Sequence, residues 1–492
     1  MNLIRKVFNK LTLTNPKSDQ YSSLEPDIIS AYNETRSPES IHLICHAPFK
    51  SIRFTQFGKA TVCWKNERHI LGEYPKNSIH EIWFGNKAEE LRTHIRHNDL
   101  TLGCETCHTH LKKGEFLELR ARDFDNKPYA EKRYPSFGEF VLGSACNLEC
   151  IMCSGKYSSS IRKNREMKPL YPDPYDDLFL EQLEEFIPYF TDTYFFGGEP
   201  FYYGLHYQIW EKMIEMNPRC NITVQTNGTL LNDRIRRILD KGKFNIHLSI
   251  DSMNSENYEK IRVNGSFSKV MQNVRYFIDY CQKNNRKIRI SVCPMRQNWQ
   301  DIPHILEFCN KNDIMIKFNP TWFPPDCSLW NWDTENLTNI LTNYKRVSFS
   351  AHSKIAEQNN QLFTGLIDQV HQWVHQSKSK PEESELDSFP AHILKEKLYH
   401  NIRTYFINEN PYLGSSDFHS SEEFIRVLEE IFISIEDSRV FKKLLVMINS
   451  YPISYLVSEA DANLKDVMVE RFKLLTRKLP VSLISKNPNH SG

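Results

Sequence analysis

The sequence predicts an α/β fold built on a partial (β/α)6 TIM-like barrel, with a small domain before it and an α-helical extension after it. The barrel is predicted because strand-like apolar runs alternate with longer amphipathic segments, which is the order of repeated βα units. The extension is predicted because its apolar residues recur only with helical spacing. The expected segments are a lead-in at 1–40, the small domain at 41–125, the barrel at 130–330 and the helical domain at 335–492.

Six apolar runs predict the parallel strands of the barrel. They are FGEFVLGS (137–144), TDTYFFGG (191–198), NITVQTNG (221–228), FNIHLSID (244–251), KIRISVCP (287–294) and IMIKFNP (314–320). Segments between them, such as LHYQIWEKMIEM, place apolar residues three and four apart, as the inner face of a helix does. In such barrels the chemistry lies at the carboxyl ends of the strands, so residues just after each run are candidate site residues.

The overall charge is nearly balanced, with 62 Lys and Arg against 61 Asp and Glu in 492 residues. This balance provides no field that would attract nucleic acid or an anionic membrane, and neither is expected as a partner. No membrane span or signal-peptide core is recognisable, which indicates a soluble, cytoplasmic protein. In a reducing compartment, metal binding or redox chemistry explains the 12 cysteines better than disulfides do.

Three cysteines follow the first strand-like run directly, in SACNLECIMCSG (144–155). Cys146, Cys150 and Cys153 are four and three residues apart. A structural zinc site normally uses four ligands, and a disulfide needs two partners in an oxidising compartment. Three thiols fit neither pattern well, although a three-thiol zinc site or buried structural cysteines remain alternatives.

Three other strand ends carry candidate binding residues. The second run ends in GGEP (Gly197 to Pro200), the third in TNGT (Thr226 to Thr229) and the fourth in SID (Ser249 to Asp251), which is followed by Arg262. Paired glycines let a backbone approach a ligand closely, and an Arg fork suits a carboxylate. Each motif alone is more often a turn, but their occurrence at successive strand ends favours one binding site.

These motifs resemble the radical SAM superfamily over about residues 135–325. The resemblance is carried by CNLECIMC as Cys-x3-Cys-x2-Cys, by GGEP and TNGT, and by SIDSMNSENYEKIRVNGSF. It implies that three cysteines ligate a 4Fe-4S cluster whose fourth iron binds S-adenosylmethionine (SAM). It also implies an enzyme, an oxidoreductase or transferase, that cleaves SAM reductively to a 5'-deoxyadenosyl radical and abstracts hydrogen from a substrate.

The resemblance assigns roles to individual residues. The expected cluster ligands are Cys146, Cys150 and Cys153, and the expected SAM contacts are Gly197, Gly198, Glu199, Thr226, Asn227, Ser249 and Arg262. Met152 departs from the aromatic residue that many relatives carry, but a thioether can also pack against adenine. No catalytic acid or base is predicted, and we expect Asp251 to hold its loop.

A second cysteine set lies upstream of the barrel. It consists of Cys45, Cys63, Cys104 and Cys107, which is a complete ligand set for one metal centre. With a hairpin around FGKATVC and a helix from Ser78 to about His97, the segment resembles the SPASM or twitch auxiliary-cluster domain, placed here before the barrel. We expect one auxiliary 4Fe-4S cluster, and a tetrahedral zinc site fits the spacing equally well.

The remaining features carry no catalytic signature. Core packing is the expected role of Cys220, Cys281, Cys293, Cys309 and Cys327. The C-terminal third is expected to be helical, with a capping box of Ser420 and Glu423 and a charged linker at 377–388. Aromatic residues at 320–332 are expected to pack between domains, and lining the barrel mouth is the alternative.

The expected substrate is a peptide or protein side chain, because peptide maturases and sulfatase-maturing enzymes share the resemblance to an auxiliary-cluster domain. A small metabolite, sugar or nucleoside is the alternative, since this fold does not fix its substrate. A non-catalytic metal-binding scaffold is the third hypothesis. The family resemblance also implies an external one-electron donor of the flavodoxin or ferredoxin type.

Overall fold

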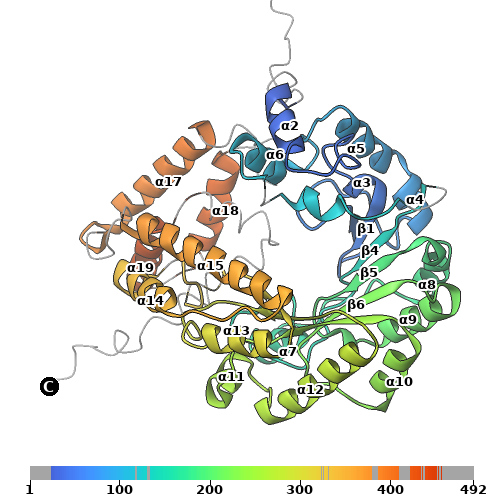
Figure 1. Cartoon of the computed structure of the whole chain (residues 1–492). Coiled ribbons are helices and arrows are strands. Elements are labelled where there is room, and N and C mark those ends of the chain that lie inside the picture. The colour runs from blue at the N-terminus through green and yellow to red at the C-terminus, as the bar shows by residue number, and fades with distance from the viewer. Residues whose placement is uncertain are drawn as a thin grey trace, which may run out of the picture.

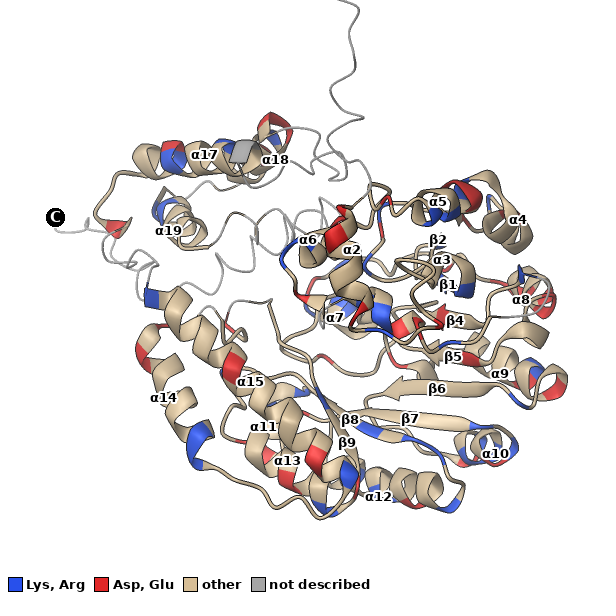
Figure 2. Cartoon of the chain, turned by 45° about the horizontal axis from the view of Figure 1, so that its top comes forward, with Lys and Arg blue, Asp and Glu red and all other residues tan. Residues whose placement is uncertain are grey.

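The structure is a computed structural model in which one curved sheet is covered by helices on its convex side (Figure 1). It describes residues 24–456 apart from 117–118, 130–132, 323, 325, 331, 379–385, 409–420, 434, 436–437, 452 and 454–455. Acidic and basic residues are interspersed along the outer helices (Figure 2). No described helix is both long and apolar enough to cross a bilayer.

The six barrel strands form in the predicted order. They are β4 (Phe137–Phe140), β5 (Asp192–Phe195), β6 (Asn221–Thr226), β7 (Phe244–Ser249), β8 (Ile288–Val292) and β9 (Met315–Phe318). Each strand lies inside its predicted run and pairs in parallel with the next one. The prediction of a partial TIM-like α/β barrel is therefore confirmed.

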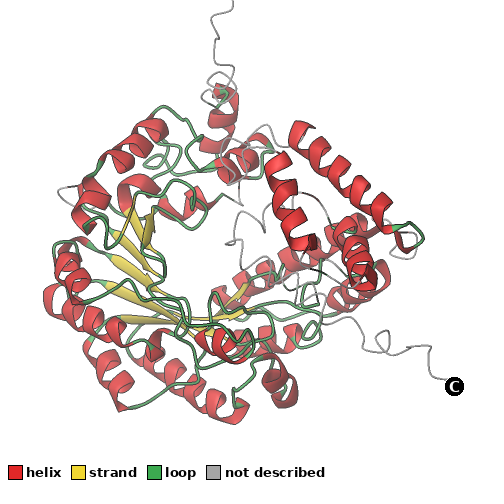
Figure 3. Ribbon diagram, turned by 180° about the vertical axis from the view of Figure 1, so that it is seen from behind, coloured by secondary structure: helices red, strands yellow, loops and turns green. Residues whose placement is uncertain are grey.

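Helices connect these strands and cover the outer face of the sheet (Figure 3). They are α7 (Ser159–Asn164), α8 (Asp177–Glu184), α9 (Gly204–Met216), α10 (Asp233–Lys241), α11 (Ser255–Ile261), α12 (Phe267–Lys283) and α13 (Ile302–Lys311). Side chains cap several of their first turns; Asp176 accepts from the backbone N–H of Phe179, and Asn232 accepts from that of Ile235. Such caps satisfy amides that have no partner within the helix.

The two faces of the sheet differ in polarity. The rings of Phe140 and Phe195 stack with centroids 4.7 Å apart, and Phe195 also contacts Trp210 of the outer helix α9. Successive residues of a strand point to opposite faces, so their neighbours Glu139 and Tyr194, which are paired in register, face the concave side. The hydrophobic core therefore lies between sheet and helices, while the concave face is polar.

The N-terminal region continues the same sheet. Its elements are α2 (Pro26–Asn33), α3 (Ala47–Lys50), β1 (Ser51–Phe54), β2 (Lys59–Thr61), β3 (Gly72–Glu73), α4 (Ile79–Phe84), α5 (Asn86–Arg96), α6 (Glu105–Lys112) and the 3-10 helix η2 (Arg120–Phe124). Strand β1 pairs in parallel with β4 and antiparallel with β2, which gives the sheet order β3-β2-β1-β4-β5-β6-β7-β8-β9. The predicted hairpin is present as β1 and β2.

The single helix expected from Ser78 to about His97 is divided in two. Helix α4 begins at a capping box of Ser78 and Glu81, and α4 and α5 are separated by Gly85 in an extended conformation. A Cβ atom at Gly85 would lie 2.2 Å from the carbonyl oxygen of Glu81. Only glycine fits this close approach, so the break follows from one residue.

The described part of the C-terminal third is helical, as predicted. It contains α14 (Thr334–Arg346), α15 (Lys354–Lys378), α17 (Ala391–Asn408), α18 (Ser421–Ile433) and α19 (Ser438–Asn449). The side chain of Asn359 in α15 accepts from the N–H of Ile316 at 2.9 Å and donates to the carbonyl of Ile314 at 2.8 Å, which covers the edge strand β9. Ser420 and most of the predicted linker lie outside the described residues.

Candidate active site and auxiliary metal centre

A cavity of about 500 Å³ lies at the carboxyl ends of the barrel strands. Its wall includes all three cysteines of the Cys-x3-Cys-x2-Cys motif. Among the predicted SAM contacts it includes Gly197, Gly198, Thr226, Asn227, Ser249 and Arg262. The structure therefore brings together residues from four strand ends, and of the site residues predicted in the barrel only Glu199 does not line this cavity.

The cysteine loop after β4 is anchored on two sides. On one side, Ser160 donates from its hydroxyl to the carbonyl of Cys146 at 2.8 Å. On the other, the N–H of Glu149 donates to the carbonyl of Val263 at 3.0 Å, and the N–H of Ile151 donates to that of Ile261 at 3.0 Å. These two bonds bring the segment that contains Arg262 alongside the cysteines.

Arg262 and Asp251 form a buried ion pair at the cavity wall. The Nε and Nη2 atoms of Arg262 lie 2.8 and 2.7 Å from Oδ2 of Asp251, and Nη1 lies 3.9 Å from Sγ of Cys150. The other carboxylate oxygen of Asp251 accepts from the N–H of Cys293 at 2.8 Å. Asp251 thus fixes the guanidinium and leaves one edge of it facing the cysteine loop.

Glu199 joins the loops after β5 and β6. Its fully buried carboxylate accepts from the hydroxyl of Thr226 at 2.8 Å and from the N–H groups of Asn227 at 2.7 Å and Phe201 at 3.1 Å. Burial raises the pKa of Glu199 to about 7, although these hydrogen bonds and Arg262 lower it. The carboxylate is directed at the second loop, so its observable role is to position the TNGT segment.

Gly198 allows the GGEP loop to contact the cysteine loop. Its φ is 55°, and a Cβ atom would lie 2.4 Å from the carbonyl oxygen of Ala145. The same carbonyl accepts from the N–H of Glu199 at 2.8 Å. A side chain at this position would therefore separate two loops that both line the cavity.

A ring of polar side chains ties the cysteine loop to the TNGT loop. Nδ2 of Asn227 donates to Oδ1 of Asn147 at 2.9 Å, and Nδ2 of Asn147 donates to the hydroxyl of Thr229 at 2.9 Å. That hydroxyl donates to Oδ1 of Asn227 at 2.6 Å. Such a closed network holds the two loops at a fixed separation.

The three thiols need a positive charge to ionise. Burial raises the pKa of Cys146 to about 11 and also raises the pKa values of Cys150 and Cys153. Among the described residues, no three His, Cys, Asp or Glu side chains lie close enough together to hold a single metal ion. A structural zinc ion normally takes four ligands, so a set of three thiols beside an open cavity fits a cluster that leaves one position for a cosubstrate.

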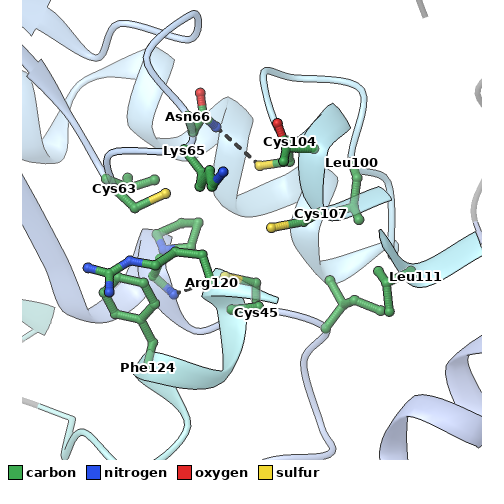
Figure 4. Close-up of a pocket in the computed structure, with 16 residues that line it drawn as sticks. Cys45, Cys63, Lys65, Asn66, Leu100, Cys104, Cys107, Leu111, Arg120 and Phe124 are labelled. Atoms are coloured by element: carbon green, nitrogen blue, oxygen red, sulfur yellow. Dashed lines mark hydrogen bonds between the residues drawn. The ribbon is translucent and has the colours of Figure 1, made fainter. Parts of the chain in front are cut away.

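The four upstream cysteines surround a second cavity (Figure 4). Cys45, Cys63, Cys104 and Cys107 share its wall with the apolar side chains of Leu100, Leu111 and Phe124 and with the charged Lys65 and Arg120. Nδ2 of Asn66 lies 3.1 Å from Sγ of Cys104, within reach of a hydrogen bond to a bound thiolate. Burial raises the pKa of Cys63 to about 11, so here too a metal centre would supply the charge that stabilises thiolates.

Several cavity residues were not predicted from the sequence. They are Leu148, Ser154, Tyr157, Ser158, Gln225, Asn319, Pro320 and Thr321, whereas Trp322 belongs to the aromatic segment for which lining the barrel mouth was the alternative. Cys293, expected in the core, also lines the cavity, whereas Cys327 is buried beside Ile261 and Met295. Gln225 is the last residue but one of β6, and Asn319 directly follows β9, so the strand-end rule could have found them.

Two family models match the chain. The model of the radical SAM superfamily matches residues 140–309, and the model of the SPASM iron-sulfur cluster-binding domain matches residues 45–108. The first range contains the cysteine triad and the cavity residues after β5, β6 and β7. The second contains all four upstream cysteines.

Curated relatives match about a third of the chain. A GTP 3',8-cyclase of Clostridium perfringens is 24% identical over 186 residues, which cover 36% of this chain and 52% of the relative. A probable GTP 3',8-cyclase of Methanocaldococcus jannaschii is 28% identical over 175 residues, covering 34% and 53%. The chain thus spans about half the length of these curated relatives.

Solved structures show a weaker likeness. Streptococcus suis SuiB bound to the precursor peptide SuiA aligns with a TM-score of 0.33 at 15% identity, covering 62% of this chain and 69% of that one. Native anSMEcpe with bound AdoMet aligns with a TM-score of 0.33 at 21% identity, covering 42% and 60%. A likeness at this level says nothing about a substrate.

The chain contains a radical SAM domain, matched over residues 140–309, and this domain supports the prediction that the protein is an enzyme. The chain also carries a SPASM domain, placed before the barrel as the sequence predicted. These domains imply a 4Fe-4S cluster with SAM in the barrel and auxiliary iron-sulfur chemistry at the upstream cysteines. The donor sets fit both groups, since each consists of thiols around one cavity.

Proposed function

We propose that this enzyme modifies a side chain of a peptide or protein after hydrogen abstraction. The observation that carries the proposal is the position of the SPASM cysteine cavity beside strands that continue the barrel sheet, since Cys63 closely follows β2 and Arg120 reaches from the cavity to β4. Arg120 lines their cavity and also lies 2.6 Å from Glu139 on the concave face. An auxiliary cluster there would stand beside the interior of the barrel, where it could bind substrate or accept an electron.

In this proposal the residues of the barrel position the cosubstrate. Reduced cluster and SAM together supply a carbon-centred radical that abstracts hydrogen. Cys146, Cys150 and Cys153 would hold the cluster, and the edge of Arg262 not used by Asp251 would bind the SAM carboxylate. The loops fixed by Glu199 and the Asn227 ring let backbone groups approach SAM, while Met152 excludes water from the cluster side of the cavity.

A nucleotide substrate is the second candidate. It is favoured by the curated relatives, which are named as GTP 3',8-cyclases. These relatives are matched over about a third of this chain, at 24% and 28% identity. Their substrate therefore does not carry over with the matched residues.

The proposal also covers the cellular location, the electron donor and the functional units of the enzyme. We place it in the cytoplasm, because both cluster sites need reducing conditions, and assign it a flavodoxin or ferredoxin type electron donor. We assign 41–125, 130–330 and 335–492 to three functional units. In this proposal the helical unit, 335–492, forms part of the mouth of the cavity. Trp322, which is 45% exposed and lines the cavity, contacts Trp373 of α15 there.

The test measures 5'-deoxyadenosine formed by the anaerobically reconstituted, reduced enzyme with SAM. Short peptides encoded near the gene are compared with GTP at equal concentration. A rise with one peptide but not with GTP is the expected result. A rise with GTP alone would replace the peptide by the second candidate, and no product from a protein with intact clusters would contradict both in favour of a scaffold.

A further inference from the structure

The concave face of the sheet carries a row of polar side chains, one from each parallel strand. The row consists of Arg53, Glu139, Tyr194, Gln225, His247, Arg289 and Lys317. Strand register pairs Arg53 with Glu139, Glu139 with Tyr194, Gln225 with His247, and His247 with Arg289. The other two links are diagonal, because Gln225 lies two residues beyond the register partner of Tyr194, and Lys317 lies two residues beyond that of Arg289. Many barrel interiors are filled with branched apolar side chains. Burying charged side chains costs free energy unless groups of opposite charge or hydrogen-bond partners lie beside them, so this charged row is expected to bind such a group.

At the β1 and β4 end the charges of the row are neutralised within the protein. Nε of Arg53 lies 3.6 Å from Oε2 of Glu139, and Nη2 of Arg120 lies 2.6 Å from Oε1 of the same carboxylate. Arg120 is also ion-paired with Asp123. The carboxylates on this side of the barrel are therefore already engaged by arginines.

At the β7 to β9 end the row is cationic. Nη2 of Arg289 lies 2.8 Å from Nδ1 of His247. Because a guanidinium can only donate, Nδ1 accepts and the imidazole is neutral. Burial first, and then the charges of Arg289, Lys317 and Lys287, hold the pKa of His247 well below its usual value. This histidine therefore adds no positive charge but orients Arg289.

Arg289 and Lys317 lack a carboxylate partner in the described part of the chain. No ion pair joins either cation to a described Asp or Glu, and Nε of Arg289 is buried without a hydrogen-bond partner. The pKa of Lys317 is lowered by burial and then by the charges of Arg289 and Arg120, although Asp123 and Glu139 act in the opposite direction without forming an ion pair with it. Two like charges that repel each other at a partly buried site would both be stabilised by an anion between them.

We propose that Arg289 and Lys317 form a subsite for an oxyanion group of the substrate, a carboxylate or a phosphate. The inference rests on the proposed function only in that the anion belongs to the molecule that the radical attacks. Both side chains point to the same face as residues of the cavity wall. Lys317 is two residues from Asn319, and His247 is two residues from Ser249, and both Asn319 and Ser249 line the SAM cavity.

The position of this subsite defines how the substrate would lie. Two residues of a strand span roughly 7 Å, so an anion held by Lys317 would lie about that far below the cavity wall. Gln225, which lines the cavity, accepts from the hydroxyl of Tyr194 in the same row. The oxyanion would thus hold one end of the substrate inside the barrel. The reacting carbon of the substrate would then be directed towards the SAM site.

The test measures anion binding directly by calorimetry on the reconstituted enzyme with saturating SAM, so that the SAM-carboxylate site is occupied. The probes are pyrophosphate and glutarate, titrated separately at constant ionic strength. Lys317→Met and Arg289→Gln should each weaken binding roughly tenfold or more, as expected for losing a charge-assisted hydrogen bond. Lys241→Met, which removes an exposed charge from the end of α10, is the matched control and should bind like the wild type.

The two probes distinguish the sources of the anion. Binding of glutarate alone assigns the subsite to a carboxylate, such as an acidic peptide side chain, and binding of pyrophosphate alone assigns it to a phosphorylated substrate. Binding that is unchanged in both barrel variants, or no binding to an enzyme whose clusters are spectroscopically intact, would overturn the subsite. Because neither probe is a substrate, failure of the peptide proposal would leave this result unaffected.

Discussion

The two cysteine sites differ in ligand number and in what surrounds the sulfur atoms. The triad lies on a cavity of about 500 Å³ whose wall also carries glycines, amides and an arginine. The four upstream cysteines enclose a much smaller space, about 20 Å³ by the same measure, walled largely by apolar side chains. An incomplete ligand set with room beside it suits cosubstrate binding, whereas a complete set in a small cavity suits a cluster without an open position.

Removing one cysteine from each site tests this contrast most strongly. Cys146→Ala should abolish 5'-deoxyadenosine formation, because the cluster that binds SAM cannot assemble. Cys107→Ala should keep basal SAM cleavage while losing the auxiliary cluster. Iron analysis should give about eight irons per chain for the wild type and about four for each variant.

The same iron analysis can contradict the contrast. One zinc and about four irons in the wild type would show that the upstream site holds a single tetrahedral ion, with thiolates that move closer together than in this structure. If Cys107→Ala retains the four irons of the barrel cluster but loses basal SAM cleavage, the upstream site is required for that cleavage and is not auxiliary. A conservative control is Cys281→Ala, which changes a buried thiol away from both sites.

The buried ion pair of Asp251 and Arg262 lies directly at the wall of the barrel site. Asp251→Ala leaves the guanidinium of Arg262 buried without its carboxylate and should lower the free energy of unfolding by about 3–5 kcal/mol. The double variant Asp251→Leu/Arg262→Met should recover part of this stability, because neither charge is left unpaired. Urea unfolding measures stability, and calorimetry measures SAM binding.

These two variants separate positioning from stability. If Asp251 acts through Arg262, the double variant regains stability but still binds SAM weakly. Normal SAM binding in the double variant would contradict the assignment of Arg262 as the carboxylate partner. Lys260→Ala is a suitable control, since its ion pair with Glu256 on α11 is exposed.

Glu199 gives the barrel site its own pH dependence of stability. Its pKa is raised from 4.5 to about 7 in the folded state, so folding favours the protonated form. The associated stability is fully present below pH 4.5 and is lost as the pH rises through about 7, by about 3 kcal/mol. Glu199→Gln should remove this slope from urea unfolding measured between pH 4.5 and 8. An unchanged slope in the variant would assign it to another group.

Much of the barrel site could be predicted from the sequence because its signals are local. Cysteine spacing, paired glycines and period-two strands each lie within a few residues, and the six strands occur where those patterns indicate. The pairing of β1 with β4 could not be predicted, since residues such as Phe54 and Phe140 are far apart in the chain and only the fold makes them neighbours. The alternation of side chains along β8 and β9 likewise did not show that Arg289 and Lys317 share the concave face, because the two residues lie on different strands that only the fold brings together.

The smallest expected effect concerns the environment of the upstream sulfur atoms. Asn66 donates from Nδ2 to Sγ of Cys104 at 3.1 Å, while its Oδ1 accepts from the N–H of His69 at 3.1 Å. Hydrogen bonds to cluster sulfur stabilise the reduced, more negative state. Asn66→Ala should therefore shift the reduction potential of the auxiliary cluster to a more negative value, measured by an EPR-monitored redox titration. The barrel cluster is the internal control, because its cysteines receive no contact from Asn66 in the described part of the chain; a shift of both potentials would show that the two sites are electronically coupled rather than independent.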